Sequence, residues 1–599
     1  MRWLALLICV SGVASAQPPW KTHLAARKAA ATHVHAPPAV DGRHKPDDVG
    51  VYDLEQVSIA FTVPEVGLPM ALSFSVTLAA QVDLEAIVPL LLLHSRAVAV
   101  TLDEGQELPF EQIRDTGELL VELPEPLLTG QRISMRIEAV LDYACSGGPN
   151  CSEAGAYLHL ADAGWYPMSL EHPAGDRFDV RLDLESDAGR FPSSIGGLAI
   201  DETPEGTRRW RYQSETPVSA LAVAFSSDPP RIVDADPIQL FGPDPDPSLS
   251  VLLESLVQSY EGLLGPYPYS RIAMTAIPDA ARAAIGPQAN LFVPLSIWRR
   301  PETDADRDFQ REIVSHEFAH QYFFNLVGIT DPTEAWLSEG FAEFTSTLFS
   351  NRVTGRSDHR WRNYWGYLTT VTEEDDAPLY GLEVRQGPHF FEITYLKGSA
   401  VLWMLRETLG DVVFDAALSD YVAAFSGQIA TTPEFIDHMA SQAQTDLGAF
   451  FDRWVYRGGH PRLVAQTTRR GVSREEVNFS LRDETVPPFE GQVPVILHDL
   501  DEQRLIQVDI GSETRVRLGE DGWIEVDPER TWLRRIRAQS TGDVNLDGAI
   551  DGKDLLDLHA ALGREIPGAT WHDTLDVVRD GRIDDADLRA VMERYGEAD

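Results

Sequence analysis

The residues most suited to chemistry lie in one short stretch, REIVSHEFAHQYFFNLVG, residues 311–328. It places His316 and His320 four positions apart, with Glu317 directly after the first histidine. Apolar residues recur at helical spacing and no Gly or Pro occurs before Gly328, so the stretch is predicted to be helical. Residues four apart share a helix face, which lets both imidazoles point at one metal ion. Glu317, about 100° around the helix, would lie beside the ion, where a carboxylate can act as a base toward water.

A catalytic zinc ion usually takes a third protein ligand and keeps one water molecule. The next segment, DPTEAWLSEGFAEF (331–344), is predicted to form a second helix, because Asp331 followed by Pro332 is typical of a helix start. It carries Glu339, 19 positions after His320. HExxH followed by Glu at this distance, in the setting WLSEGFAE, resembles the gluzincins of peptidase family M1, the aminopeptidase N type.

The resemblance implies a zinc-dependent hydrolase that cleaves peptide bonds, with sharp motifs between residues 260 and 463. Glu317 would be its general base. The segment FFEITYLKGSAVLWMLRETLG (390–410) resembles the helix that carries the family's catalytic tyrosine, so Tyr395 would donate a hydrogen bond to the oxyanion formed during hydrolysis. The ligands implied for the single zinc ion are His316, His320 and Glu339.

One segment departs from the family pattern. Aminopeptidases of this family carry a Gly-Xaa-Met-Glu-Asn strand whose Glu binds the substrate's free α-amine. The matching segment is IGPQANLFV (285–293), in which Gly286 and Asn290 keep their places while Gln288 and Ala289 stand for Met and Glu. An alanine cannot pair with an ammonium group, whereas the strand can still bind substrate backbone. We therefore expect a metallopeptidase with altered recognition of the N-terminus, acting as an exo- or an endopeptidase.

Two further acids are candidates for supporting roles. Glu343 shares a helix face with Glu339 and is placed to accept a hydrogen bond from a zinc-bound imidazole, although an exposed helix acid remains the alternative. Glu171, in WYPMSLEHP, is a candidate substitute for the missing α-amine ligand, with a solvated loop acid as the alternative.

The C-terminal tail carries a second set of metal ligands. DVNLDGAIDGKDLLDL (543–558) spaces its oxygen-bearing side chains as a calcium loop, with Gly548 at the turn, and DVVRDGRIDDADLRAV (576–591) repeats the pattern with Val578 in one ligand position. The Asp at the last position and the leucine-rich helix after it resemble a dockerin type I repeat. This resemblance implies one or two Ca²⁺ ions and a cohesin-like partner. The predicted calcium ligands are Asp543, Asn545, Asp547, Asp551 and Asp554 in the first loop and Asp576, Asp580, Asp584 and Asp587 in the second.

The length of 599 residues indicates several domains. Alternating apolar runs predict strands, and helical periodicity predicts a thermolysin-like α+β catalytic domain that carries the zinc motif. The predicted organisation is a signal peptide (1–16), a linker (17–48), a β-rich N-terminal domain (49–235), the catalytic domain (236–460), a small β-sandwich (461–537) and an EF-hand-like helical dockerin module (538–599).

Charge and cysteines bear on partners and compartment. A net charge of −43 argues against nucleic acid and anionic membranes as partners, and apart from the predicted leader no run is long and apolar enough to span a membrane. The predicted leader indicates a secreted or extracellular protein, with a periplasmic or cell-surface location as the alternative. Cys145 and Cys151 flank a turn-rich loop and are expected to form a local disulfide, because a zinc pair would lack two ligands. A binding or scaffold protein that no longer cleaves, docked through its calcium module, is the alternative function.

Overall fold

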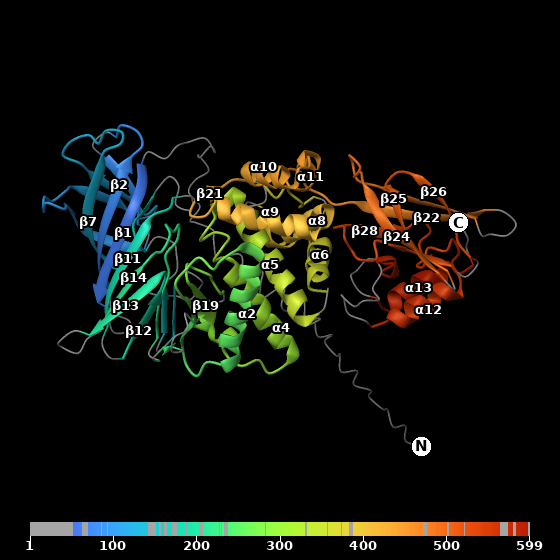
Figure 1. The fold of residues 1–599 in the computed structure, drawn as a ribbon, viewed down its shortest axis with the longest axis horizontal. Coiled ribbons are helices and arrows are strands. Elements are labelled where there is room, and N and C mark those ends of the chain that lie inside the picture. The colour runs from blue at the N-terminus through green and yellow to red at the C-terminus, as the bar shows by residue number, and fades with distance from the viewer. Residues whose placement is uncertain are drawn as a thin grey trace, which may run out of the picture.

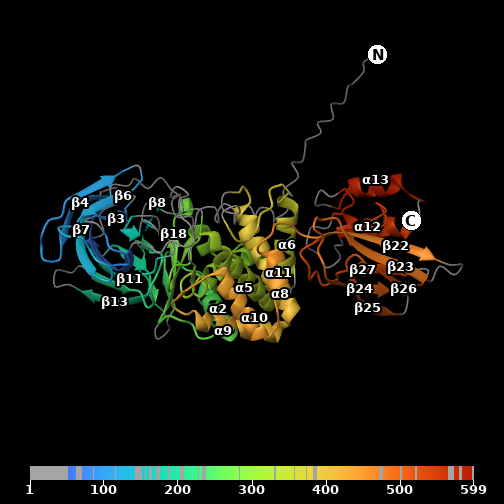
Figure 2. The same cartoon turned by 90° about the horizontal axis from the view of Figure 1, so that it is seen from above.

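In the computed structural model, three parts follow one another in chain order along the molecule's long axis (Figure 1). A β-rich part lies at one end, a mainly helical part lies in the middle, and a β-sandwich with two short helices beside it forms the other end (Figure 2). In the described part of the chain, no helix is long and apolar enough to cross a membrane. The structure describes residues 52–596 without 63–69, 85–86, 93, 115, 142–150, 155–156, 161–164, 170–175, 187–188, 203–207, 227, 229, 233–237, 282, 330–331, 356–357, 373, 382–386, 471–475, 500–501, 520–521, 564–572 and 579–582.

The N-terminal part is β-rich, as predicted, because its strands alternate buried and exposed side chains. Val57 of β1 (Tyr52–Thr62) lies opposite Val76 of β2 (Met70–Ala80), and both side chains are fully buried. β1 also pairs in parallel with β11 (Asp179–Ser186), so the centre of the sheet joins segments far apart in the sequence. This sheet has the order β13-β14-β11-β1-β2-β7-β4.

Two smaller sheets, β10-β3-β6-β5 and β12-β15-β9-β8, complete this part. The remaining strands are β3 (Ile87–Leu91), β4 (Ser95–Leu102), β5 (Phe110–Ile113), β6 (Glu118–Glu122), β7 (Arg132–Leu141), β8 (Cys151–Ala154), β9 (Tyr157–Leu160), β10 (Met168–Ser169), β12 (Phe191–Ser194), β13 (Gly197–Glu202), β14 (Arg208–Gln213) and β15 (Val223–Ser226).

The middle part combines a four-stranded sheet with packed helices. Its strands are β16 (Arg231–Ile232), β17 (Ile238–Phe241), β18 (Ile272–Ile277) and β19 (Asn290–Pro294), with β20 (Gly328–Ile329) and β21 (Ile429–Ala430) forming a separate pair. β16 precedes the predicted domain boundary at residue 235 but pairs with this sheet. The helices are α2 (Pro247–Leu264), α3 (Leu295–Trp298), α4 (Asp304–Ala319), α5 (Trp336–Thr354), α6 (Asp358–Thr370), α8 (Gly398–Leu409), α9 (Asp411–Ala424), α10 (Thr432–Ala443) and α11 (Gly448–Trp454), with a π-helical turn at Glu392–Lys397 and 3₁₀ turns at Asp279–Ala281 and Pro332–Glu334.

Helix α4, which carries the HExxH motif, ends earlier than the sequence predicts. It stops at Ala319, so the prediction of a helix that continues toward Gly328 is wrong. The Asn325 side chain donates a hydrogen bond to the His320 carbonyl (2.7 Å), and Phe324 adopts a left-handed conformation with φ of 96°. The His320 carbonyl also accepts the Asn325 amide (3.2 Å), whereas the Phe324 amide, which would reach it in a continued helix, donates to the carbonyl of Val327 (2.8 Å). The regular hydrogen-bond pattern of the helix therefore ends here.

The C-terminal part is a two-sheet sandwich followed by a short helical module. The sheets have the orders β26-β23-β22-β28 and β25-β24-β27. Their strands are β22 (Arg462–Arg470), β23 (Glu476–Asp483), β24 (Gln492–His498), β25 (Gln503–Asp509), β26 (Glu513–Arg517), β27 (Trp523–Val526) and β28 (Arg535–Ala538), and the module contains α12 (Gly552–Ala561), a 3₁₀ turn (Asp573–Leu575) and α13 (Asp585–Glu593).

Two glycines set the distance between α5 and α8. A Cβ atom added to Gly398 would lie 3.1 Å from the Cα atom of Gly340 and 3.8 Å from the Cβ atom of Trp336. A Cβ atom at this position would be held more tightly than most Cβ atoms, so the two backbones approach unusually closely here. Gly340 directly follows Glu339, and Gly398 lies three residues after Tyr395, so this contact positions the helices that carry both functional side chains.

We expect Gly398→Ala to lower the free energy of unfolding by about 1–3 kcal/mol, because the added methyl group overpacks the helix crossing. Denaturant unfolding measures this change. Gly262→Ala in α2 is the control, since nothing lies within 4 Å of its added Cβ atom. That control is expected to be neutral or to stabilise by up to about 1 kcal/mol. If both substitutions changed the free energy of unfolding equally, close packing at the crossing of α5 and α8 would not explain the effect of Gly398→Ala.

Candidate metal centre

Helices α4 and α5 bring the three predicted zinc ligands together. Nε2 of His316 lies 3.2 Å from Oε2 of Glu339, and Nε2 of His320 lies 3.4 Å from the same oxygen. One donor atom from each residue falls within 4.8 Å of the others, and all three side chains are buried. Two imidazoles and one carboxylate form a donor set that suits catalytic zinc and leaves a position for water. The side chains at this site therefore fit the predicted metal.

The second nitrogen of each imidazole is held by the protein. Nδ1 of His316 lies 3.2 Å from Oε2 of Glu343, whose other oxygen accepts a hydrogen bond from Asn363 Nδ2 (2.7 Å). Nδ1 of His320 lies 3.2 Å from the carbonyl oxygen of Phe323. These contacts direct both Nε2 atoms toward the metal position. The contact predicted for Glu343 is thus present, whereas no sequence pattern pointed to Asn363.

The two residues predicted to act on substrate lie beside this cluster. Glu317 is buried next to His316, and a Cβ atom on Gly286 would lie 2.1 Å from the Glu317 carbonyl oxygen, so the chain before β19 packs directly on α4. The ring of Tyr395 stacks on that of His316, with centroids 5.6 Å apart and an angle of 7° between the planes. Burial, followed by the charge of Glu339 and a hydrogen bond to it, raises the Tyr395 pKa well above 10. The phenol therefore stays protonated and can donate a hydrogen bond at neutral pH.

Tyr395 lies in a π-helical turn, a form often found at functional sites. The turn is fixed by the fully buried Lys397, whose Nζ lies 3.4 Å from Oδ1 of Asp376. Asp376 also accepts a hydrogen bond from the Tyr367 hydroxyl (2.6 Å). Lys397 belongs to the Tyr-Xaa-Lys-Gly motif, whereas no sequence pattern singles out Asp376.

The segment predicted to bind substrate is turned into the protein. Gln288 bonds to Thr216 and to the amide of Glu215, and Asn290 bonds to the oxygens of Ser193 and Ser194. Ala289 is fully buried with φ of 59°, and its amide donates to the side chain of Gln321 (2.7 Å).

The side chains of Gln288, Ala289 and Asn290 are all buried, so in this structure they are not placed to contact a substrate directly. That this segment binds substrate stays a prediction. Glu171 lies outside the described residues.

The first predicted calcium loop gathers buried carboxylates. Asp543 accepts hydrogen bonds from the amides of Asp547 and Gly548 (both 3.0 Å), and Asp554 accepts from those of Val544 and Asp551 (both 2.8 Å). Burial and the charges of Asp554 and Asp547 raise the Asp543 pKa well above 3.8. Several hard oxygen donors that repel one another suit a calcium ion, and Asn545 and Asp551 lie in the same loop.

The second loop is described only in part. Asp576 is buried, and Asp587 accepts hydrogen bonds from the amides of Val578 (3.0 Å) and Asp584 (2.9 Å). Asp580 lies outside the described residues. Cys145 does as well, and the side chain of Cys151 in β8 is not described, so the disulfide stays a prediction.

We expect Glu343→Gln to weaken zinc binding about 10- to 100-fold, because the charged acceptor that orients His316 is lost while the side-chain shape is kept. Competition with a chelating dye measures the affinity. Glu254→Gln, an exposed position on α2, is the matched control. An unchanged affinity in Glu343→Gln would show that this contact does not support the metal.

We also expect zinc affinity to rise with pH. Burial lowers the His316 pKa, but hydrogen bonds to Glu339 and Glu343 outweigh burial and raise the pKa from 6.5 to about 9 in the metal-free protein. Because the folded value is the higher one, this proton stabilises the metal-free fold fully below about pH 6.5, and the stabilisation is lost as the pH rises through about 9.

Zinc must displace that proton, so its affinity should increase by up to about tenfold per pH unit between about 6.5 and 9. Calorimetry in buffers of different ionisation enthalpy counts the protons released. Zinc binding at pH 7 without proton release would contradict this assignment.

Comparison with known proteins agrees with this geometry. Residues 249–454 match the peptidase family M1 domain, and residues 541–594 match the dockerin type I domain. Aminopeptidase M1-B of Oryza sativa subsp. japonica is 24% identical over 334 residues, 51% of this chain and 38% of that relative. Aminopeptidase N of Haemophilus influenzae is 30% identical over 183 residues, 29% of this chain and 21% of the relative. The chain thus spans well under two thirds of the length of these relatives.

A solved structure shares the fold. It is a two-domain M1 zinc metallopeptidase, a mutant bound to L-arginine, with a TM-score of 0.57 and 20% identity over 68% of this chain and 95% of that chain. The zinc motif of α4 and α5 falls within the first matched segment, and both predicted calcium loops fall within the second. Residues 249–454 are therefore a peptidase family M1 domain, and residues 541–594 are a dockerin type I domain.

Proposed function

We propose that this chain is a zinc-dependent peptidase that hydrolyses peptide bonds. The convergence of His316, His320 and Glu339 on one point, with Glu317 and Tyr395 beside it, carries the proposal. The alternative of a scaffold that no longer cleaves would not require these five side chains to stay together in a buried site. The names of the relatives support peptides as the substrate class.

The chain's own residues supply the rest of the chemistry. When bound, zinc would polarise the scissile carbonyl and lower the pKa of a water molecule. Glu317 accepts a proton from that water and delivers it to the amine that leaves. Tyr395 donates its hydroxyl hydrogen to the oxyanion, since a phenol is protonated at neutral pH.

Recognition of the substrate's N-terminus is proposed to differ from that of an aminopeptidase. The segment from Gly286 to Asn290 offers no carboxylate to pair with an ammonium group. Without that pairing, the enzyme is proposed to accept substrates with blocked N-termini.

The terminal segments support an exported, calcium-binding protein. Residues 1–16 are proposed to be a cleaved leader, and Cys145 is proposed to pair with Cys151. The two loops of the dockerin domain are proposed to bind one or two Ca²⁺ ions, with a cohesin-like protein as partner. Dockerin domains are typical of extracellular or cell-surface proteins, so secretion or attachment to the cell surface is the proposed location.

A matched pair of peptides, one with a free N-terminus and one acetylated, tests the peptidase proposal. We expect the zinc-loaded protein to cleave both, because no described residue of the 286–290 segment can pair with an α-amine. Cleavage is followed by chromatography in zinc and calcium. Glu317→Ala is the blank: it should keep zinc and lose hydrolysis by a factor of at least about 10².

Three other results are informative. Cleavage of the free peptide alone would mean that another group binds the α-amine. Cleavage that survives Glu317→Ala would refute the assigned base. A zinc-loaded protein inactive on all peptides would favour the scaffold alternative.

A further inference from the structure

The dockerin domain is packed against the sandwich through its first calcium loop, here residues 543–554. The Thr467 hydroxyl of β22 donates a hydrogen bond to the carbonyl oxygen of Leu546 (2.8 Å). The Ile524 amide of β27 donates to the carbonyl oxygen of Asn545 (3.3 Å). Both sandwich sheets therefore contact the same turn of the loop. Figures 1 and 2 show α12 and α13 lying along the sandwich.

The side chain of Leu546 extends this contact into the sandwich interior. It is 3% exposed and belongs to the sandwich's own apolar core, with Leu463 and Val526 among the residues of that core. Leu546 adopts a left-handed conformation (φ 55°) between Asn545 and Asp547, two of the predicted calcium ligands. The backbone turn that inserts Leu546 is thus the same turn that directs ligand oxygens into the loop.

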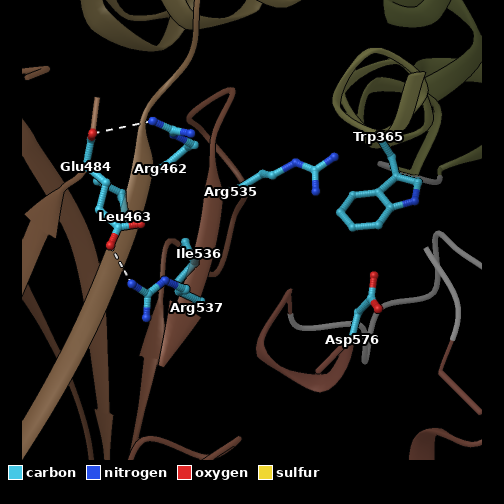
Figure 3. A pocket seen from close by; sticks show the side chains of 8 residues that line it. All are labelled: Trp365, Arg462, Leu463, Glu484, Arg535, Ile536, Arg537 and Asp576. Atoms are coloured by element: carbon cyan, nitrogen blue, oxygen red, sulfur yellow. Dashed lines mark hydrogen bonds and ion pairs between the residues drawn. The ribbon is translucent and has the colours of Figure 1, made fainter. Parts of the chain in front are cut away.

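The domain also contacts the catalytic part. Its buried apolar residues Val544, Ile550 and Val591 belong to one continuous cluster with Leu533 and with the core around the metal helices. A cavity of about 90 Å³ lies at this junction, lined by Trp365 of α6, Arg535 of β28 and Asp576, the first residue of the second loop, among others (Figure 3). In Figure 3 the Arg535 side chain extends toward Trp365. Arg535 also donates a hydrogen bond to the carbonyl of Leu368 in α6.

Charge determines when this arrangement is stable. Asp543, Asp547 and Asp554 are buried together in the first loop. Buried carboxylates repel one another unless a cation binds among them. A cation that orders the loop therefore also orders the surface that docks on the sandwich. Because binding and docking use one loop conformation, each must strengthen the other by the same factor.

We propose that the dockerin domain is docked in cis on the chain's own β-sandwich, and that calcium in its first loop locks this contact. The proposal rests on the calcium site proposed above and not on peptidase activity. In calcium the domain is a fixed part of the molecule, and without calcium the loop detaches from β22 and β27. In the docked, calcium-bound state a partner protein must bind the faces of the dockerin domain that the sandwich does not cover. Leu556, Met592 and Tyr595 are exposed there.

Hydrogen exchange on the full-length protein tests the lock, with calcium or with chelator. We expect calcium to slow exchange of the Ile524 amide by up to about 100-fold at 100 times the dissociation constant. Calcium binding is measured separately by titration. If calcium binds but exchange at Ile524 does not change, the lock is refuted while the calcium site stands. If calcium does not bind, both are refuted.

Substitutions that spare every predicted ligand sharpen the test. Leu546→Ala should bind calcium and lose at least about tenfold of the protection at Ile524, since the anchor is removed. Leu556→Ala, an exposed leucine on α12, is the matched control and should keep full protection. Thr467→Val, on the sandwich side of the contact, should also weaken protection of the Ile524 amide. This second variant keeps the test valid if Leu546→Ala does not fold. Full protection in both Leu546→Ala and Thr467→Val would overturn the proposal.

Discussion

Concentrated negative charge in a buried space is the constraint on which the middle part depends. Glu317, Glu339 and Glu343 lie around His316 with little access to water. Burying a carboxylate is costly unless a cation or several hydrogen bonds compensate the charge. Two imidazoles and a divalent ion provide that compensation, so binding of the metal also stabilises the site. The carboxylates raise the His316 pKa against the effect of burial, and they add to the effect of burial in raising the Tyr395 pKa.

Such a site tolerates little freedom in the helices that form it. The two-glycine contact between α5 and α8 brings their backbones together, and the buried pair of Lys397 and Asp376 fixes the π-helical turn between them. A buried ion pair is weak evidence for stability, but it can specify one arrangement over others. Here that arrangement places the tyrosine ring flat on a metal-binding imidazole.

The sequence was most informative where chemistry depends on local spacing. His316 and His320 could be predicted because helical geometry puts them on one face. Glu339 followed from the resemblance to the gluzincins, and Glu343 from the face it shares with Glu339. The end of α4 could not, since it depends on the Asn325 side chain capping a carbonyl rather than on Gly or Pro. The alternation of buried residues similarly indicated the β-rich and sandwich parts, but not which strands pair.

Contacts between distant segments were likewise invisible in the pattern. Asp376 is brought to Lys397 by the tertiary fold, and Leu546 reads as an ordinary loop residue although it fills part of the sandwich core. Ala289 could be identified by its place in a motif, but not its left-handed backbone, whose amide donates a hydrogen bond to Gln321 from a different element.

The parallel pairing of β1 with β11 has a consequence for how the chain folds. Strand β1 forms at the start of the N-terminal part, but one of its two neighbours is more than about a hundred residues further along, and closing so long a loop is slow. As the chain leaves a ribosome or a membrane channel from its N-terminus, β1 and β2 can pair early and still present an open edge until β11 arrives. An unpaired edge of this kind is where strands of other chains can add. The sheet therefore stays incomplete for a long time during synthesis. In that interval a chaperone would protect the N-terminal part rather than the metal centre.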